Sequence, residues 1–147
     1  MELQRAGDLA RELMQAHGLT DWKFTVDFAK RRFGQCRYSK KEISLSIPLT
    51  KLNSEEKVRD TILHEIAHAL AGPRTGHGRI WKQKAAAIGA NPKRCYGDEV
   101  IAPPKAFKGT CPAGHTTERD RIRKGLACGK CCGGKYDPAH KFVWTRN

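Results

Sequence analysis

The sequence predicts an α+β fold in which helices pack on one face of a short antiparallel sheet. A helical repeat of apolar residues opens the chain, alternating apolar and polar stretches follow, and two more helical repeats come next. Elements in this order pack as a layer of helices on a sheet. With 147 residues, the chain suits one domain (residues 1–104) and a small appended module (residues 105–147).

Local periodicity predicts the N-terminal elements. Apolar residues recur at helical spacing from Leu3 to Met14, and Gly18 ends that helix. Residues 22–28 alternate apolar and polar side chains as a strand with one buried face, and residues 34–38 form a second strand. A third strand alternates and ends at a proline: Ile43, Leu45, Ile47 and Pro48.

The most informative motif is His-Glu-Ile-Ala-His at residues 64–68. Residues four apart lie on one face of a helix, so His64 and His68 can each place an imidazole nitrogen on one zinc ion. Glu65 can then take the proton of a zinc-bound water, whose pKa zinc lowers to roughly 7. This is the zincin arrangement for peptide hydrolysis. The alternative is a solvated helix face that carries the same residues.

The surrounding sequence favours the zinc site, because the motif lies on an amphipathic helix. Asn53 or Ser54 caps the start of the helix, and Gly72 followed by Pro73 ends it. The apolar stripe at helical spacing consists of Val58, Ile62, Ile66, Ala69 and Leu70.

A catalytic zinc ion usually has three protein ligands and one open position, so a third ligand must come from elsewhere. The metzincin spacing is excluded because Ala71 and Arg74 stand where a glycine and a histidine would be needed. His77 is the candidate, flanked by two glycines that let the backbone bend sharply. The alternative is an exposed loop histidine. The helix that follows is marked by Trp81, Ala85, Ile88 and the terminal Gly89.

Residues 64–70 and the segment Gly-His-Gly-Arg-Ile-Trp-Lys at 76–82 closely resemble the SprT-like metalloproteases, which include the eukaryotic Spartan proteases. Residues 91–95 are similar as well. The resemblance implies a minimal zincin-like domain in which His64, His68 and His77 bind zinc and Glu65 is the general base. It also implies DNA-dependent proteolysis of proteins crosslinked to DNA. In zincins a strand beside the cleft can pair with an extended substrate, and residues 43–47 are our candidate for that edge.

Four of the six cysteines lie from Cys111 onward and predict a zinc ribbon. Cys128 and Cys131 form a Cys-x-x-Cys knuckle, and Cys111 with His115 completes a Cys₃His set for a structural zinc ion. The family's usual ribbon has two cysteine pairs, so His115 is a departure. Cys132 is the competing fourth ligand, but adjacent cysteines seldom both bind one tetrahedral ion.

Disulfides are disfavoured because the N-terminal residues do not form a secretory signal, so reduced thiols and an intracellular protein are expected. A redox role for the Cys-x-x-Cys pair is disfavoured too, since no thioredoxin-like pattern surrounds it. Cys36 and Cys95 are interpreted as small buried residues.

The charge predicts a polyanionic partner. Lys and Arg number 28 against 15 Asp and Glu, which gives a net charge of +13 and favours nucleic acid. In a predicted strand at 116–123, Arg119, Arg121 and Arg123 would share one face, with Lys124 beside them. Such a row would bind DNA phosphates without sequence readout, and the alternative is a solvated strand face. Residues 30–41 hold a second, less defined basic group.

These observations favour a zinc-dependent endopeptidase, with one catalytic and one structural zinc ion, that acts on DNA-bound or DNA-crosslinked proteins. Two alternatives stay open: a non-catalytic zinc protein that binds nucleic acid, and a metalloprotease that works without DNA. We expect a monomer without membrane association, since no apolar run approaches the roughly eighteen residues of a membrane span. It would act at the nucleoid or in the cytoplasm of a prokaryote or virus, and in a eukaryotic nucleus.

Overall fold

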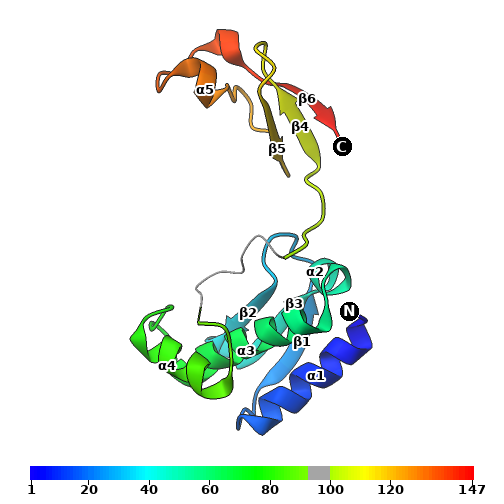
Figure 1. The fold of residues 1–147 in the computed structure, drawn as a ribbon, viewed down its shortest axis with the longest axis vertical. Coiled ribbons are helices and arrows are strands. Elements are labelled where there is room, and N and C mark those ends of the chain that lie inside the picture. Colours follow the sequence, from blue (N-terminus) through cyan, green and yellow to red (C-terminus); the bar gives the residue numbers. More distant parts are fainter. Residues whose placement is uncertain (93–99) are drawn as a thin grey trace. The chain divides into compact units, whose positions relative to one another are not determined.

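The computed structural model describes residues 1–92 and 100–147. The chain divides into two compact units, Met1–Pro103 and Pro104–Asn147, each with its own sheet (Figure 1). The α+β class is therefore confirmed. Cys95 lies outside the described residues, so the interpretation of it as a small buried residue stays a prediction. Within the described ranges, no helix has the length and apolar character needed to cross a membrane.

Helix α1 (Leu3–Ala16) buries one face and exposes the other, as its periodicity predicts. It ends where Gly18 adopts a φ of 81° and the Leu19 N–H donates to the Met14 carbonyl at 2.8 Å. A glycine in this conformation closes the last turn without strain. The buried face consists of Ala6, Gly7, Leu9, Ala10, Leu13 and Met14.

The first sheet contains β1 (Lys23–Asp27), β2 (Gly34–Arg37) and β3 (Glu42–Ser46) in the order β1-β3-β2. Strand β3 is antiparallel to β2 but parallel to β1, so the predicted antiparallel arrangement holds for only one of the two pairs. The predicted edge at residues 43–47 is wrong, because β3 is the central strand. Its burial on both faces explains this position, since Ser44 is only 4% exposed.

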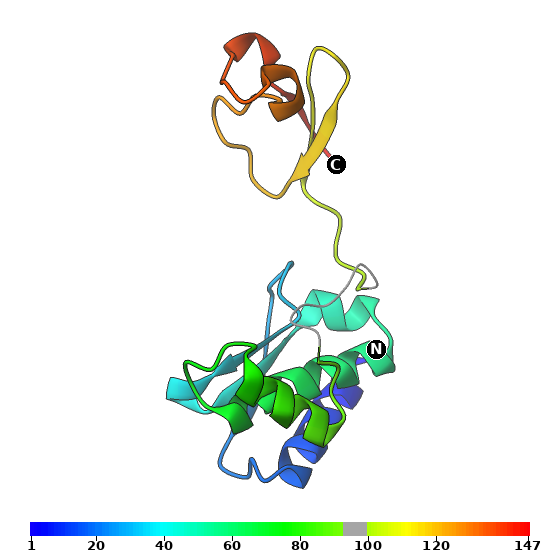
Figure 2. The same cartoon turned by 60° about the vertical axis from the view of Figure 1, so that its left-hand side comes forward.

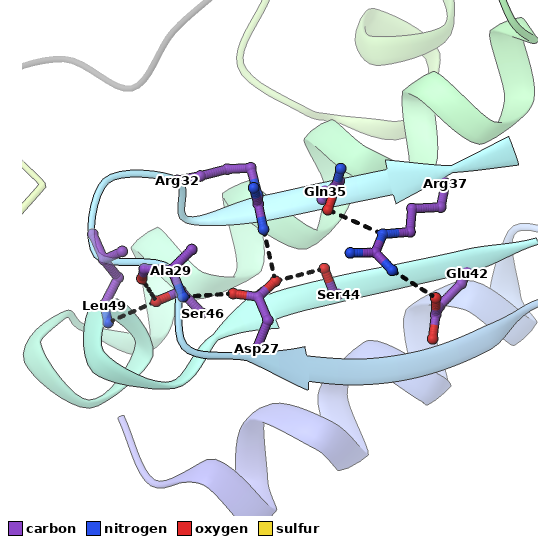
Figure 3. A network of polar contacts seen from close by, with 9 residues as sticks. All are labelled: Asp27, Ala29, Arg32, Gln35, Arg37, Glu42, Ser44, Ser46 and Leu49. Atoms are coloured by element: carbon purple, nitrogen blue, oxygen red, sulfur yellow. Dashed lines mark hydrogen bonds and ion pairs between the residues drawn. The ribbon is translucent and has the colours of Figure 1, made fainter. Parts of the chain in front are cut away.

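The loop after β1 is held onto β3 by the carboxylate of Asp27 (Figure 3). One oxygen accepts from the Ala29 N–H at 2.9 Å, and the other accepts from the Ser44 hydroxyl at 2.9 Å and from Arg32 at 3.2 Å. Burial raises the pKa of Asp27, but these hydrogen bonds outweigh burial and hold that pKa below its usual value. The loop is thereby fixed where it leads into β2.

A short helix, α2 (Ile47–Leu52), follows β3 directly and was not predicted. The Ser46 side chain caps it by accepting from the Leu49 N–H at 3.2 Å, and Pro48 stands in its first turn. Serine before an early proline is an N-terminal signal that sequence reasoning could have used. We interpreted Pro48 only as the end of a strand.

Helix α3 (Glu55–Ala71) forms the centre of the first unit, and Ser54 is its N-cap. Its residues Val58, Ile62 and Ile66 are completely buried, as the predicted stripe requires. α3 packs against α1, α4 (Arg79–Ile88), β2 and β3, and Figure 2 shows these helices turned by 60° from Figure 1. The helix that carries the motif is therefore rigidly supported on several sides.

The second unit is built on β4 (Phe107–Thr110), β5 (Thr116–Arg119) and β6 (Val143–Arg146), all antiparallel in the order β5-β4-β6. The central strand β4 was not predicted, and β5 ends at Arg119 rather than at residue 123. Both errors have one cause. A four-residue strand is too short to give a clear alternating pattern.

The indole ring of Trp144, in strand β6, packs on the central strand β4. A Cβ atom at Gly109 would lie 2.9 Å from the Trp144 ring, so the contact requires glycine at that position of β4. Between β5 and β6 lie α5 (Gly129–Cys132) and the 3-10 turn η2 (Pro138–His140). The unit buries few apolar side chains, so other interactions must stabilise it.

Candidate metal centre and cavity

Three imidazoles meet at one point of the first unit. The Nε2 atom of His77 lies 3.1 Å from Nε2 of His64 and 3.0 Å from Nε2 of His68. His64 and His68 come from successive turns of α3, and His77 comes from the turn before α4. The three ring nitrogens lie within 4.8 Å of one another, and this group could hold a metal ion.

The turn between α3 and α4 directs His77 back toward α3. Gly72 ends α3 with a φ of 90°, and its carbonyl accepts a hydrogen bond from the Thr75 hydroxyl at 2.8 Å. Gly76 adopts a φ of 52°, which glycine reaches without a steric penalty. The Gly78 N–H then donates to the Thr75 carbonyl at 3.1 Å, just before α4 begins.

Trp81 supports all three histidines, a role that sequence reasoning missed. The ring is completely buried, and its centroid lies 4.7 Å from that of His64, 5.4 Å from that of His68 and 4.8 Å from that of His77. Its indole N–H donates to the His64 carbonyl at 3.3 Å. The sequence signal that could have indicated this role is the spacing, because Trp81 follows His77 by four residues and lies in the first turn of α4.

The environment keeps the first two histidines neutral. Burial, together with the neighbouring His68 and His77 rings, lowers the pKa of His64 to about 3. Burial and His77 lower the pKa of His68 to about 4. A neutral imidazole carries the lone pair that a metal ion needs, so both rings are suited to bind one at neutral pH.

Beside the histidines lies a cavity of about 590 Å³ that contains Glu65 in its wall. Glu65 is 5% exposed and directly follows the first histidine on α3. Three residues of β2, at positions 34–36, line the same cavity, and β2 is an edge strand of the sheet. The rest of the lining consists of Arg31, Arg32, Phe33, Tyr38, Leu49, Val100 and Ala102.

Tyr38 and Cys36 contribute a hydroxyl and a thiol to the lining of the cavity. Tyr38, in the 3-10 turn η1 (Tyr38–Lys40), donates its hydroxyl to the His68 carbonyl at 2.9 Å. Burial raises the pKa of Tyr38 to about 12, and burial with the nearby Glu65 raises the pKa of Cys36 to about 12. Both side chains are therefore neutral at neutral pH. The prediction that Cys36 is buried is wrong, since it is partly exposed in the cavity.

The second unit gathers Cys111, His115, Cys128 and Cys131, whose ligand atoms lie within 4.8 Å of one another and could hold a metal ion. Nδ1 of His115 lies 3.4, 3.6 and 3.3 Å from the three sulfur atoms, in sequence order. Cys132 is not in this group, and its sulfur lies 3.7 Å from the Asp137 carbonyl. The arrangement favours His115 over Cys132.

Two turns build this group. After Cys111 the chain reverses at Gly114, whose φ is 88° and whose N–H donates to the Cys111 carbonyl at 2.9 Å. Cys128 is the N-cap of α5, where the backbone N–H of Cys131 lowers the pKa of the Cys128 thiol to about 7. A thiolate is the form that binds metal ions, so the helix start prepares this ligand.

The four predicted DNA-binding residues do not form a strand row. Arg119 is the last residue of β5, whereas Arg121, Arg123 and Lys124 lie in the loop that follows. The three arginines nevertheless line one hollow of about 500 Å³, together with Asp120 and Leu126. Lys124 is exposed and lies outside that lining.

Fold and site together define an α+β protein in which two histidines of one helix and one histidine of the following turn could hold a metal ion. A family model described as the SprT-like family matches residues 8–100, so the chain belongs to this family. The Germ cell nuclear acidic-1 protein of Caenorhabditis elegans is 31% identical over 121 residues, which cover 71% of this chain and 22% of the relative. The chain thus spans about a fifth of that relative's length.

Proposed function

We propose that this chain is a zinc-dependent endopeptidase that cleaves proteins held on, or crosslinked to, DNA. The observation that carries the proposal is the meeting of His64, His68 and His77 beside Glu65 in one cavity. Membership of the SprT-like family supports a metallopeptidase. The strong positive charge of the chain, +13, supports action near nucleic acid.

The donor set fits zinc. Two nitrogens bound to one tetrahedral zinc ion at 2.0–2.1 Å lie about 3.3 Å apart, and the two separations here are 3.1 and 3.0 Å. The group has three members, which leaves one coordination position for water or substrate. The Cys₃His group of the second unit also fits zinc and would be structural, because its four members complete a tetrahedral site.

A zinc ion in the histidine site would supply Lewis-acid activation of a water molecule and of the substrate carbonyl. Glu65 would act as the general base, taking the proton from the attacking water and passing it to the leaving amine. Its position directly after His64, with only 5% exposure, holds the carboxylate in the cavity. Cys36 and Tyr38, kept neutral, would leave Glu65 as the acceptor of that proton.

The polypeptide substrate would lie along β2. This strand has β3 on one side, and it lines the cavity at residues 34–36. An extended peptide can add to a sheet edge through backbone hydrogen bonds, which do not depend on sequence. Such binding suits an enzyme whose targets share their location on DNA and not a common sequence.

DNA would bind the second unit at the hollow lined by Arg119, Arg121 and Arg123. The basic residues of the first unit are less suitable, because Arg32 pairs with Asp27 and Lys41 pairs with Asp21. Guanidinium groups around one hollow favour phosphate without reading base edges. Binding there would raise the effective concentration of DNA-held substrates. The chain is proposed to be monomeric and intracellular, and nuclear in a eukaryote, as the name of its nematode relative suggests.

The decisive experiment is a cleavage assay on a protein crosslinked to DNA, comparing the wild type with Glu65→Gln. We expect Glu65→Gln to keep its zinc content and DNA affinity and to lose cleavage. Glu56→Gln is the matched control, because Glu56 is exposed in the first turn of the same helix. Cleavage by Glu65→Gln at the wild-type rate would show that the assigned base is wrong.

DNA dependence is tested in the same assay by omitting DNA and by raising the salt concentration. We expect DNA to accelerate cleavage of a DNA-binding substrate, and salt to weaken that acceleration. Equal rates with and without DNA would favour a metalloprotease that works independently of DNA. DNA binding and zinc content without cleavage of any substrate would favour the non-catalytic alternative.

A further inference from the structure

One wall of the cavity belongs to residues 100–102, which lie near the C-terminal end of the first unit. Val100 and Ala102 line the cavity, whereas the Ile101 side chain between them is 57% exposed. Alternation of this kind is typical of extended backbone, in which successive side chains point to opposite sides. The segment thus presents the small apolar side chains of Val100 and Ala102 to the cavity and the side chain of Ile101 to solvent.

Side chains of the first unit fix this segment in place. The Asn53 amide pairs with the backbone of Ile101 in both directions, donating to its carbonyl at 2.7 Å and accepting from its N–H at 2.8 Å. Asn53 is 3% exposed and also donates to the Leu49 carbonyl at 2.8 Å. Arg31 donates to the Pro103 carbonyl at 2.6 Å. The segment is therefore held to the first unit at Ile101 and at Pro103.

Val100 and Ala102 share the cavity with two core side chains, Phe33 and Leu49, which are 1% and 2% exposed. Together these four side chains make an apolar region that is continuous with the region of Glu65 and the histidines. A peptide whose cleaved bond lay at the histidine site would place a neighbouring side chain against this apolar region. Burying an apolar side chain there would strengthen substrate binding.

The charges at the cavity discriminate among side chains. Arg31 and Arg32 both line it, so a lysine or arginine side chain of the substrate would be repelled. An acidic side chain of the substrate would gain less binding than the positive charges of Arg31 and Arg32 suggest. Arg31 already donates to the Pro103 carbonyl, and Arg32 is paired with Asp27.

We propose that Val100 and Ala102 determine specificity, by binding an apolar side chain of the substrate next to the cleaved bond. This inference rests on the proposed function and names the substrate class of the same site. Under this proposal, different residues of the cavity bind the backbone of the substrate and select its side chain. Strand β2 would bind the peptide backbone without regard to sequence, and the side chains of Val100 and Ala102 would select the side chain of the substrate.

The test uses quenched fluorescent peptides that differ at the residues flanking the cleaved bond, with alanine, leucine, phenylalanine, glutamate or lysine there. DNA is present throughout. The wild type should prefer leucine or phenylalanine over alanine by about 10-fold or more in kcat/KM, with lysine the poorest. Ala102→Leu narrows the cavity and should remove the preference for phenylalanine. Val100→Ala widens it and should increase that preference.

Ile101→Ala is the matched control, because its side chain is exposed between the two lining residues. Its peptide profile should equal that of the wild type. Zinc content and the thermal unfolding midpoint are measured for each variant, and the two opposite substitutions guard against a general loss of folding. A profile unchanged in both Ala102→Leu and Val100→Ala would overturn this inference alone. Failure of the wild type to cleave any peptide or protein would overturn the proposed function, and the inference with it.

Discussion

Gly34 and Glu65 lie so close together that no other residue fits at position 34 without movement. A Cβ atom on Gly34 would be 3.0 Å from Cγ and 3.3 Å from Oε1 of Glu65, and 3.0 Å from Cγ2 of Thr61. The edge strand β2 is therefore in close contact with α3 at Thr61 and at the residue proposed as the base. A peptide paired with β2 would be brought next to Glu65 by this close approach.

Gly34→Ala should lower kcat, because the added methyl group would displace the Glu65 carboxylate. A misplaced catalytic group costs on the order of 10²-fold in rate. Zinc content should not change, since the three histidines lie outside this contact. Gly129→Ala is the control, because a Cβ atom there would meet nothing within 4 Å. A Gly34→Ala enzyme with the wild-type kcat would contradict the close approach as a determinant of catalysis.

Tyr38→Phe should destabilise the first unit only modestly. The His68 carbonyl would lose the Tyr38 hydroxyl but would keep the Gly72 N–H, which donates at 3.0 Å. The expected loss is about 0.5–1.5 kcal/mol in the free energy of unfolding, measured in urea. Tyr136→Phe, at an exposed ring, should cause no measurable change. A loss of several kcal/mol would mean that Tyr38 has a further structural role.

The ionised carboxylate of Asp27 should make the free energy of unfolding depend on pH in the acidic range. Its pKa in the folded protein is below the model-compound value of 3.8, so its contribution is complete above that value and is lost as the pH falls through the folded pKa. Asp27→Asn should therefore be less stable than the wild type at neutral pH, and the gap should shrink below about pH 4. Urea unfolding at neutral and acidic pH measures this. A gap that is independent of pH would show that the charge of Asp27 does not contribute.

Removal of metal should unfold the second unit and spare the first. Among described residues 104–147, only Cys111 and Cys128 count as buried hydrophobic side chains, and both belong to the metal group. A unit with so small a core needs a metal to fold. Limited proteolysis after chelation should cut within residues 104–147, and His115→Ala should act likewise without a chelator. His140→Ala is the control, and equal protection in all samples would contradict a structural metal.

The metal centre was largely predictable, because its signals are local. Two histidines one helical turn apart and a histidine between glycines can be recognised without knowing which strands are neighbours. The same holds for α1 and α3, whose apolar spacing gave their buried faces. Helix α2 was missed although Ser46 and Pro48 signalled it, because we gave Pro48 a single meaning.

The rest depends on contacts between distant residues. Alternation indicates that β3 is a strand, but it does not show that both faces of β3 are buried or that β1 pairs with it in parallel. Tyr38 lies 30 residues from His68, and Asn53 lies 48 residues from Ile101. No local pattern predicts such pairs. The prediction that the arginines form a row on one strand was wrong for a related reason, since the length of β5 is set by its pairing with β4.

The position of β3 has a consequence for synthesis. β3 lies between β1 and β2, although both precede it in the sequence. No two strands of this sheet can pair until residues 42–46 have left the ribosome. Until then, a nascent chain would carry an amphipathic helix and two unpaired strands with nothing to bury them, which is the stage at which it is most exposed to aggregation.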